Sequence, residues 1–354
     1  MAGKTYLSIV VPIYNAEKYL PECMDSLLST SGIEKTEILL IDDGSTDGSG
    51  KIADSYAEST AGADNASDAC DNAADGCAKS TETLPEDASG GAGERPEIRV
   101  IHKENEGPSA TRNLGMKEAR GEYIFFCDAD DMVEPVLFEK IISMSETSKD
   151  DMFLWDSEIV YDLKDFMAHK DPEYFAHYGL PKVEKTYSGK EIMEILIREG
   201  KGFIATVWLS AYRKEFLLSN ELFFETGLIY EDELWVPKVL LKAKSVHYIP
   251  EKIYRYRVRP GSITNPDKKD LRKNVEALYY VYTSLYKYYD EVLAGDPLQA
   301  AVEGNLTKRY LHMIYKLRFW KYGYGKKIDK KKLWKTSRRF RDKVLVLGLY
   351  VIAH

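Results

Sequence analysis

The sequence has few cysteines, no long apolar run and no excess of positive charge, and each shortage excludes a class of protein. Its four cysteines in 354 residues form no Cys-x-x-Cys pair, which fits a reducing compartment better than a disulfide-rich secreted domain. No run of about 18 apolar residues occurs, so we expect no membrane-spanning helix. The apolar run at residues 7–11 ends at Pro12 and is too short for a signal-peptide core, so we do not expect export. The net charge of −8 argues against a general nucleic-acid-binding protein.

That net charge combines two oppositely charged parts. Residues 308–343 carry fifteen Lys and Arg and two acidic residues, a net charge of +13, and the rest of the chain carries −21. Within residues 306–322, one set of side chains recurs at helical spacing and is apolar: Tyr310, Met313, Ile314, Leu317 and Trp320. Another face can carry Lys308, Arg309, His312 and Lys316. A basic amphipathic helix suits an anionic membrane surface, and the apolar run at 344–353 is long enough to dip into the interface. Packing on the rest of the chain, dimerisation and nucleic-acid binding are the alternatives.

Short apolar runs alternate with segments of helical periodicity through the first half of the chain. We predict buried strands at residues 7–13, 37–41, 98–102, 123–127 and 152–155. We predict helices at residues 16–29, 49–58, 109–119 and 135–145. The alternation predicts an α/β fold in which helices cover both faces of a mostly parallel, Rossmann-like sheet.

Two segments depart from this alternation. Residues 59–95 are rich in Ala, Asp, Gly, Ser and Thr and bury too little apolar surface to offset their ordering entropy. We therefore predict a flexible acidic insertion there, with an acidic partner-binding loop as the alternative. Beyond residue 267 the sequence is helical in amphipathic pieces. We place a domain boundary near Pro266, between residues 1–265 and a basic helical region at 266–354.

Polar clusters follow three of the predicted strands. In an open parallel sheet, ligands bind at the carboxyl ends of the strands, because the adjoining loops and helix N-termini converge there. Tyr14 and Asn15 follow the first strand, residues 42–48 follow the second, and residues 128–131 follow the fourth. These clusters are therefore predicted to meet at one edge of the sheet.

Asp128 and Asp130 form the sharpest of these patterns. Residues i and i+2 of an extended chain project to the same side, so both carboxylates can face one cation. Hard carboxylate oxygens without His or Cys select Mg²⁺ or Mn²⁺, and such ions keep water and substrate phosphates as further ligands. The alternative is a solvated acidic turn, and Asp131 can instead cap a following helix.

Other candidates at this edge remain ambiguous from chemistry alone. Tyr14 can stack on a base or fill a gap, and Asp42 and Asp43 can accept from a nucleoside or form an ordinary turn. Arg112, in the first turns of a helix that follows a Gly-Pro turn, can hold a phosphate or lie on a plain surface helix. The acidic cluster at residues 231–233 can hold a general base or only complement a helix dipole.

Together these segments resemble the family 2 glycosyltransferases of the GT-A fold, of the bacterial surface-polysaccharide kind. The resemblance covers residues 7–264 apart from the insertion. It rests on the segments SIVVPIYNAEKYL, EILLIDDGSTDGSG, VIHKENEGPSATRNLGMKEARGEYIFFCDADD, GLIYEDELW and YRYRVRPGSIT. One departure lies at residues 208–212, where relatives often have Trp-Asn-Lys-Leu-Tyr and this chain has Trp-Leu-Ser-Ala-Tyr; the change removes an amide and a cation on the acceptor side.

The resemblance implies an inverting, metal-dependent enzyme. Such enzymes transfer a sugar from a nucleoside diphosphate sugar, most often a UDP-sugar, to a hydroxyl of a glycan or a lipid-linked acceptor, with Mn²⁺ or Mg²⁺ as cofactor. By position, Pro12, Tyr14 and Asp43 would contact the nucleoside, and Arg112 would lie near the nucleotide.

The same resemblance implies roles for three acidic residues. Asp128 and Asp130 would form the DxD motif, with Asp130 as the direct metal ligand, and Asp232 would be the base that deprotonates the acceptor hydroxyl. The alternative is a non-catalytic sugar-nucleotide or glycan-binding module on the same fold, which the intact acidic residues disfavour. We expect a cytoplasmic protein, peripheral at the inner face of the cell membrane, with no nucleic-acid partner and with a homodimer as an open possibility.

Overall fold

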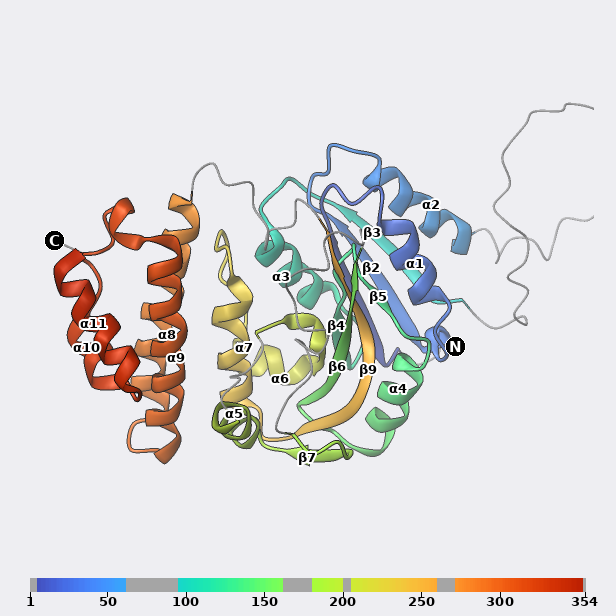
Figure 1. The fold of residues 1–354 in the computed structure, drawn as a ribbon. Helices are drawn as coiled ribbons and strands as arrows, with labels where there is room; N and C mark the ends of the chain where they lie inside the picture. Colours follow the sequence, from blue (N-terminus) through green and yellow to red (C-terminus); the bar gives the residue numbers. More distant parts are fainter. Residues whose placement is uncertain (1–4, 62–94, 162–179, 200–204, 260–270, 353–354) are drawn as a thin grey trace, which may run out of the picture.

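A twisted sheet with helices on both faces forms the first part of the molecule. The computed structural model describes residues 5–61, 95–161, 180–199, 205–259 and 271–352. In Figure 1 one side of the sheet is covered by α1 (Leu20–Leu28), α2 (Ser49–Ala61) and α4 (Leu137–Thr147). The other side is covered by α3 (Pro108–Glu118), α6 (Lys214–Ser219) and α7 (Glu231–Lys242). The predicted α/β class, with helices on both faces, is confirmed.

The strands of the described residues form one sheet in the order β3-β2-β1-β4-β8-β6-β9-β5, and β7 pairs with β9. Their bounds are β1 (Leu7–Ile13), β2 (Thr36–Asp42), β3 (Glu97–His102), β4 (Tyr123–Phe126), β5 (Met132–Val133), β6 (Met152–Tyr161), β7 (Lys185–Tyr187), β8 (Ser210–Arg213) and β9 (Val246–Val258). The longer ladders, β1 with β2 and β4, β2 with β3, and β6 with β9, are parallel. The short ladders of β8, β5 and β7 are antiparallel. The sheet is therefore mostly parallel, as predicted.

The central strands form because nearly every residue in them is buried. All seven residues of β2 and six of the seven of β1 are buried, which is why residues 9–13 of β1 and 38–41 of β2 are apolar without polar alternation. The five predicted strands and the four predicted helices are all present, with ends displaced by a few residues. Helix α2 continues to Ala61, into the start of the predicted insertion. Residues 62–94 of that insertion and the boundary near Pro266 lie outside the described residues.

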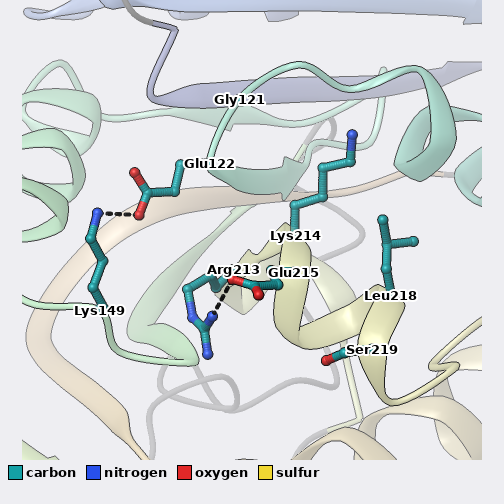
Figure 2. A pocket seen from close by; sticks show the side chains of 8 residues that line it. All are labelled: Gly121, Glu122, Lys149, Arg213, Lys214, Glu215, Leu218 and Ser219. Carbon is teal, nitrogen blue, oxygen red and sulfur yellow. Dashed lines mark hydrogen bonds and ion pairs between the residues drawn. The ribbon is translucent and has the colours of Figure 1, made fainter.

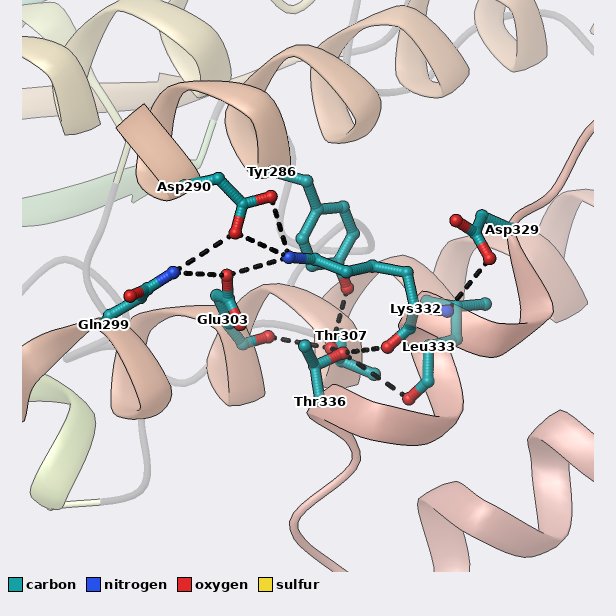
Figure 3. Close-up of polar contacts among 9 residues, drawn as sticks. All are labelled: Tyr286, Asp290, Gln299, Glu303, Thr307, Asp329, Lys332, Leu333 and Thr336. Carbon is teal, nitrogen blue, oxygen red and sulfur yellow. Dashed lines mark hydrogen bonds and ion pairs between the residues drawn. The ribbon is translucent and has the colours of Figure 1, made fainter. Parts of the chain in front are cut away.

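The chain after residue 270 forms a helical layer against α7. It consists of α8 (Arg272–Val292), α9 (Pro297–Leu317), α10 (Lys330–Thr336) and α11 (Phe340–Ile352), and α5 (Gly189–Arg198) packs against both α7 and α9. Figure 3 shows the polar network that joins three of these helices. The Lys332 ammonium of α10 contacts Asp290 of α8 at 2.8 Å and Glu303 of α9 at 3.0 Å. These contacts fix α9 between its neighbours.

The apolar side of α9 is buried inside this layer. Tyr310 and Ile314, two positions of the predicted membrane-facing stripe, are almost fully buried, and the ring of Tyr310 stacks on Tyr282 of α8 with centroids 4.6 Å apart. This stripe therefore packs on protein, and the expectation that it faces lipid is wrong for this helix. Among the described residues no helix is long and apolar enough to cross a bilayer.

Helix α3 lies very close to β1 at Gly115. A methyl group at Gly115 would come within 2.3 Å of a Val10 Cγ atom in the fully buried centre of the sheet. We expect Gly115→Ala to lower the free energy of unfolding by about 1–3 kcal/mol through overpacking. Urea denaturation measures this effect. Lys117→Ala, on the exposed side of the same helix, should stay within about 0.5 kcal/mol of wild type, and equal stability of both variants would contradict the close packing.

Candidate active site

The loops after β1 and β2 are joined by hydrogen bonds at the carboxyl edge of the sheet. The Asn15 backbone N–H donates to Ser45 Oγ at 3.0 Å, and the Thr46 N–H donates to Asn15 Oδ1 at 2.8 Å. Asn15 is in the left-handed region with φ 50°, a conformation that Asn tolerates better than most residues. Tyr14 beside it is 53% exposed, and its ring is therefore accessible to a ligand.

Asp43, at the end of β2, is buried and holds the loop that leads into α3. Its carboxylate accepts hydrogen bonds from the backbone N–H groups of Glu106 at 3.0 Å and Gly107 at 2.8 Å, and Lys103 forms an ion pair with it. Gly107 has φ 88°, and Pro108 at the first helical position then starts α3. Asp43 therefore fixes the position at which α3 begins.

Arg112, one turn into α3, joins two acidic segments from different parts of the chain. Its Nη2 donates to Asp128 Oδ1 at 2.9 Å and its Nη1 donates to Glu231 Oε1 at 2.5 Å. Burial disfavours the charged guanidinium, but the two carboxylates outweigh this and raise the pKa of Arg112 above its ordinary value. The DxD segment and the acidic cluster at the start of α7 are thus held on either side of one cation.

Asp130 contacts a second guanidinium. Arg259 Nε, just after β9, donates to Asp130 Oδ2 at 2.6 Å. Burial and the nearby charge of Asp128 raise the pKa of Asp130, and Arg259 opposes this shift. The carboxyl groups of Asp128 and Asp130 therefore concentrate negative charge in the DxD segment.

Asp131 has a structural role that differs from the predicted helix cap. It is almost fully buried, and its carboxylate accepts from Tyr254 Oη and from the Arg257 backbone N–H, both at 2.7 Å. The residues that follow it form β5, so no helix begins there. Asp131 therefore links the DxD turn to β9 through hydrogen bonds.

Asp232 lies in the first turn of α7. Tyr230 before it is left-handed, with φ 64° and ψ 38°, and the partly buried Asp232 carboxylate accepts from the Glu233 backbone N–H at 2.8 Å. Burial, followed by the charges of Glu231 and Glu233, raises the pKa of Asp232 well above its ordinary value, although Arg112 opposes the shift. A carboxyl group with a raised pKa is a stronger base when ionised, which suits proton abstraction.

The described residues contain no cluster of three His, Cys, Asp or Glu side chains that can hold a metal ion by itself. Asp128 and Asp130 supply carboxylate oxygens, which Mg²⁺ and Mn²⁺ prefer. Burial and the charge of Asp128 raise the pKa of Asp130, and a divalent cation bound there would favour its ionised form. The residues present therefore fit an ion that takes its remaining ligands from water and a bound diphosphate.

The structure thus brings the predicted clusters to one edge, with direct contacts linking Arg112 to Asp128 and the first two strand-end loops to each other. Pro12 lies in β1 opposite Ile41, near the exposed Tyr14. Neither Pro12 nor Tyr14 contacts Asp130 or Asp232 in the described hydrogen bonds. The roles of these residues in binding and catalysis stay predictions.

Sequence reasoning missed several residues that shape this edge. Arg259 lies in the segment YRYRVRPGSIT, where Arg257 and Arg259 alternate at the end of a strand and so can reach the same side. That alternation is a signal that could have identified Arg259. Glu231 and its partner Arg112 lie 119 residues apart, and no local pattern marks such a pair.

A shallow pocket lies at the opposite edge of the sheet, away from these residues. Figure 2 shows its lining, which comes from the segment before β4, from Lys149, from the end of β8 and from α6. Lys149 pairs there with Glu122, and Arg213 with Glu215. Because it faces the amino end of β4, this pocket is not part of the candidate site.

Comparisons with known proteins identify the family. The family model described as "Glycosyl transferase family 2" matches residues 8–67 and 71–218. The protein described as uncharacterized glycosyltransferase EpsJ of Bacillus subtilis strain 168 is 31% identical over 291 residues, which are 82% of this chain and 71% of that protein. Glycosyltransferase GlyG of Streptococcus pneumoniae serotype 4 is 30% identical over 261 residues, 73% of this chain and 72% of that protein.

The fold has a solved counterpart. The crystal structure of residues 1–349 of TarS from S. aureus, in complex with UDP-GlcNAc, aligns with 98% of this chain and 81% of that chain at a TM-score of 0.61 and 18% identity. That likeness confirms the GT-A fold expected from the sequence, in which the carboxyl edge of the sheet carries the candidate site. The family model and the relatives show that the chain belongs to glycosyl transferase family 2.

Proposed function

We propose that this glycosyltransferase is a metal-dependent, inverting enzyme that uses a nucleoside diphosphate sugar as donor. The acceptor would be a hydroxyl of a glycan or of a lipid-linked sugar in cell-surface polysaccharide synthesis. The observation that carries the proposal is the position of Arg112, which holds the DxD segment and the acidic cluster of α7 within reach of one guanidinium. This contact supports a single site in which Asp128 and Asp130 would bind the metal and Asp232 would be the base.

The donor would bind along the carboxyl edge. The exposed ring of Tyr14 would stack on the base, Pro12 and Asp43 would contact the nucleoside, and Arg112 would lie near the nucleotide. We favour a UDP-sugar carrying a hexose or an N-acetylhexosamine, because the structural counterpart TarS was solved with UDP-GlcNAc. Asp43 already accepts from two backbone N–H groups, so a contact with the base would use its remaining lone pairs.

The chemical step needs one proton acceptor and a stabilised leaving group. Asp130, with Asp128 beside it, would hold Mn²⁺ or Mg²⁺, which neutralises the charge that develops on the departing diphosphate. Asp232 would accept the proton of the acceptor hydroxyl while the oxygen attacks the anomeric carbon from the face opposite the diphosphate. Attack from that face inverts the configuration, and Arg112 keeps Asp128 and the α7 turn in fixed positions during the step.

Donor hydrolysis by the purified full-length protein tests this proposal. We expect release of nucleotide from at least one member of a panel of UDP- and GDP-sugars, and we expect this release to require Mn²⁺ or Mg²⁺. Asp232→Asn should lower the rate by about 10²–10⁴-fold, because it removes the base. Asp130→Asn should abolish the response to the metal.

The matched control is Glu139→Gln on the exposed side of α4, which should retain wild-type hydrolysis. The alternative, a non-catalytic sugar-nucleotide or glycan-binding module on the same fold, predicts donor binding without turnover. A panel in which no donor is hydrolysed, together with unchanged behaviour of Asp130→Asn, would therefore contradict the enzyme.

We also propose that the protein attaches to the inner face of the cell membrane, through α11 rather than α9. Four side chains at helical spacing form the α11 apolar face: Phe340, Val344, Leu347 and Val351. All four are exposed, with Phe340 at 84% and Val351 at 77%. An exposed apolar stripe of this kind marks a binding surface. The side chains around it indicate what kind of surface it binds.

Cationic side chains surround the α11 apolar face. Lys343 lies 5.4 Å from the ring centroid of Trp334, and Lys330 lies 5.5 Å from that of Tyr350; both rings are more than 40% exposed. Further exposed cations on α10 and around the start of α11 are Lys331, Lys335, Arg338 and Arg341. Apolar, aromatic and basic groups in this combination suit an anionic bilayer surface, where each Lys or Arg adds about 1 kcal/mol.

Vesicle co-sedimentation measures this attachment. The full chain should bind vesicles that contain phosphatidylglycerol and should bind neutral phosphatidylcholine vesicles much more weakly. The double substitution Leu347→Glu and Val351→Glu should reduce binding to the anionic vesicles by at least about tenfold, because it places two charges in the apolar face.

Val183→Glu, at an exposed position outside these helices, provides the control and should bind as wild type does. Wild-type binding by the double variant would contradict attachment through α11. A change from dimer to monomer in that variant, with no vesicle binding by either protein, would show that a second copy covers the face.

A further inference from the structure

The helical layer contacts the turn that carries Asp232. Asn274 of α8 donates from Nδ2 to Tyr230 Oη at 2.8 Å, directly before α7. Arg309 of α9 pairs through Nη2 with Glu233 Oε2, directly after Asp232. Both side chains of this ion pair are about three-quarters buried. The residues on either side of Asp232 are therefore held by two helices that lie outside the sheet.

The charges around Asp232 are arranged in two pairs. Its neighbours Glu231 and Glu233 are both acidic; Glu231 pairs with Arg112 of α3, and Glu233 pairs with Arg309 of α9. The charged and titratable groups that act on Asp232 or on its neighbours are Glu231, Glu233, Arg112, Arg309, Tyr212 of β8, and Tyr282 and Tyr289 of α8, which face the Glu233–Arg309 pair. Each acidic neighbour of the candidate base is thus paired with a cation: Glu233 with Arg309, and Glu231 with Arg112, which it shares with Asp128.

We propose that Arg309 is a positioning residue for Asp232: its ion pair with Glu233 fixes the first turn of α7 and offsets one of the two negative charges beside the candidate base. The proposal rests on the proposed function, in which Asp232 is the base. It gives the helical layer a part in the reaction besides attachment. In this proposal Arg309 has no direct part in donor binding or in the chemical step, and it would act on Asp232 through Glu233.

The position of Arg309 is well determined by its surroundings. Helix α9 is held to α8 and α10 by Lys332 and by the buried hydroxyl chain of Tyr286, Thr307 and Thr336, with contacts of 2.7 and 2.6 Å (Figure 3). Thr307 lies two residues before Arg309 on the same helix. A cation anchored in this way stays beside Glu233 without reordering its own helix.

Removal of Arg309 should raise the pKa of Asp232. With Arg309 absent, the Glu233 carboxylate is no longer offset, and a nearby negative charge disfavours ionisation of Asp232. The pKa of Asp232 then rises further, and the base is available only at higher pH. Removal of Glu233 alone has the opposite effect, because Arg309 stays and an anion is lost. Removal of both should nearly cancel.

The experiment is the pH profile of kcat for hydrolysis of the UDP-sugar that the full-length protein turns over fastest, at saturating donor and Mn²⁺. Arg309→Gln should move the acidic limb up by about 0.5–1 pH unit, and Glu233→Gln should move it down. The double variant Arg309→Gln with Glu233→Gln should return the limb close to wild type, and Arg309→Lys should leave it near wild type because the charge is kept.

Lys316→Gln, at an exposed position of the same helix, removes the same charge away from the site and should leave the profile unchanged. A lower kcat in Arg309→Gln with an unmoved limb would show a purely structural role and overturn the inference. If Arg309→Gln does not fold, Glu233→Gln and Arg309→Lys carry the same test. Full hydrolysis by Asp232→Asn would overturn the proposed function itself, so the two failures are distinguishable.

Discussion

The guanidinium of Arg112 is the interaction on which the candidate site depends. It donates hydrogen bonds to Asp128, after β4, and to Glu231, at the start of α7, and so joins two segments that are far apart in the sequence. Its position depends in turn on Asp43, which holds the loop that begins α3, and on Gly115, which allows α3 to approach β1. Without this cation, the carboxylates of Asp128 and Glu231 would repel each other at one edge of the sheet.

Charge balance connects the helical layer with this edge. The strongly basic segment at 308–343 is not only a surface of free charge, because Lys332 pairs inside the layer and Arg309 pairs with the α7 turn. Among its exposed cations, Lys331, Lys335, Arg338 and Arg341 lie on α10 and around the start of α11, beside the apolar face. This segment thereby supplies structural ion pairs, a contact to Glu233 beside the candidate base, and cations suited to an anionic lipid surface.

The sequence predicted the parallel strands β1, β2, β3, β4 and β6, because buried parallel strands contain apolar runs such as residues 38–41 of β2. It did not predict β9, whose apolar residues are interrupted by Pro250, Glu251 and Lys252, or β8, a four-residue strand containing Ser210 and Arg213 that forms only through its neighbours. The strand-end rule predicted the edge that carries the candidate site. The ion pair of Arg309 with Glu233 joins positions 76 residues apart through helix packing, so no local pattern marks it. The apolar stripe of α9 is compatible with cover by protein or by lipid, so the sequence alone could not decide between them.

The most direct measurement of the inverting mechanism is real-time proton NMR of the sugar that the full-length protein releases from an α-linked UDP-sugar. The reaction is run with Mg²⁺, because this ion is diamagnetic and leaves the spectrum sharp. In the proposed mechanism, water activated by Asp232 would attack from the face opposite the diphosphate, so the β-anomer should appear first and then equilibrate. The α-anomer as first product would contradict the account, as would donor breakdown that continues unchanged in Asp232→Asn.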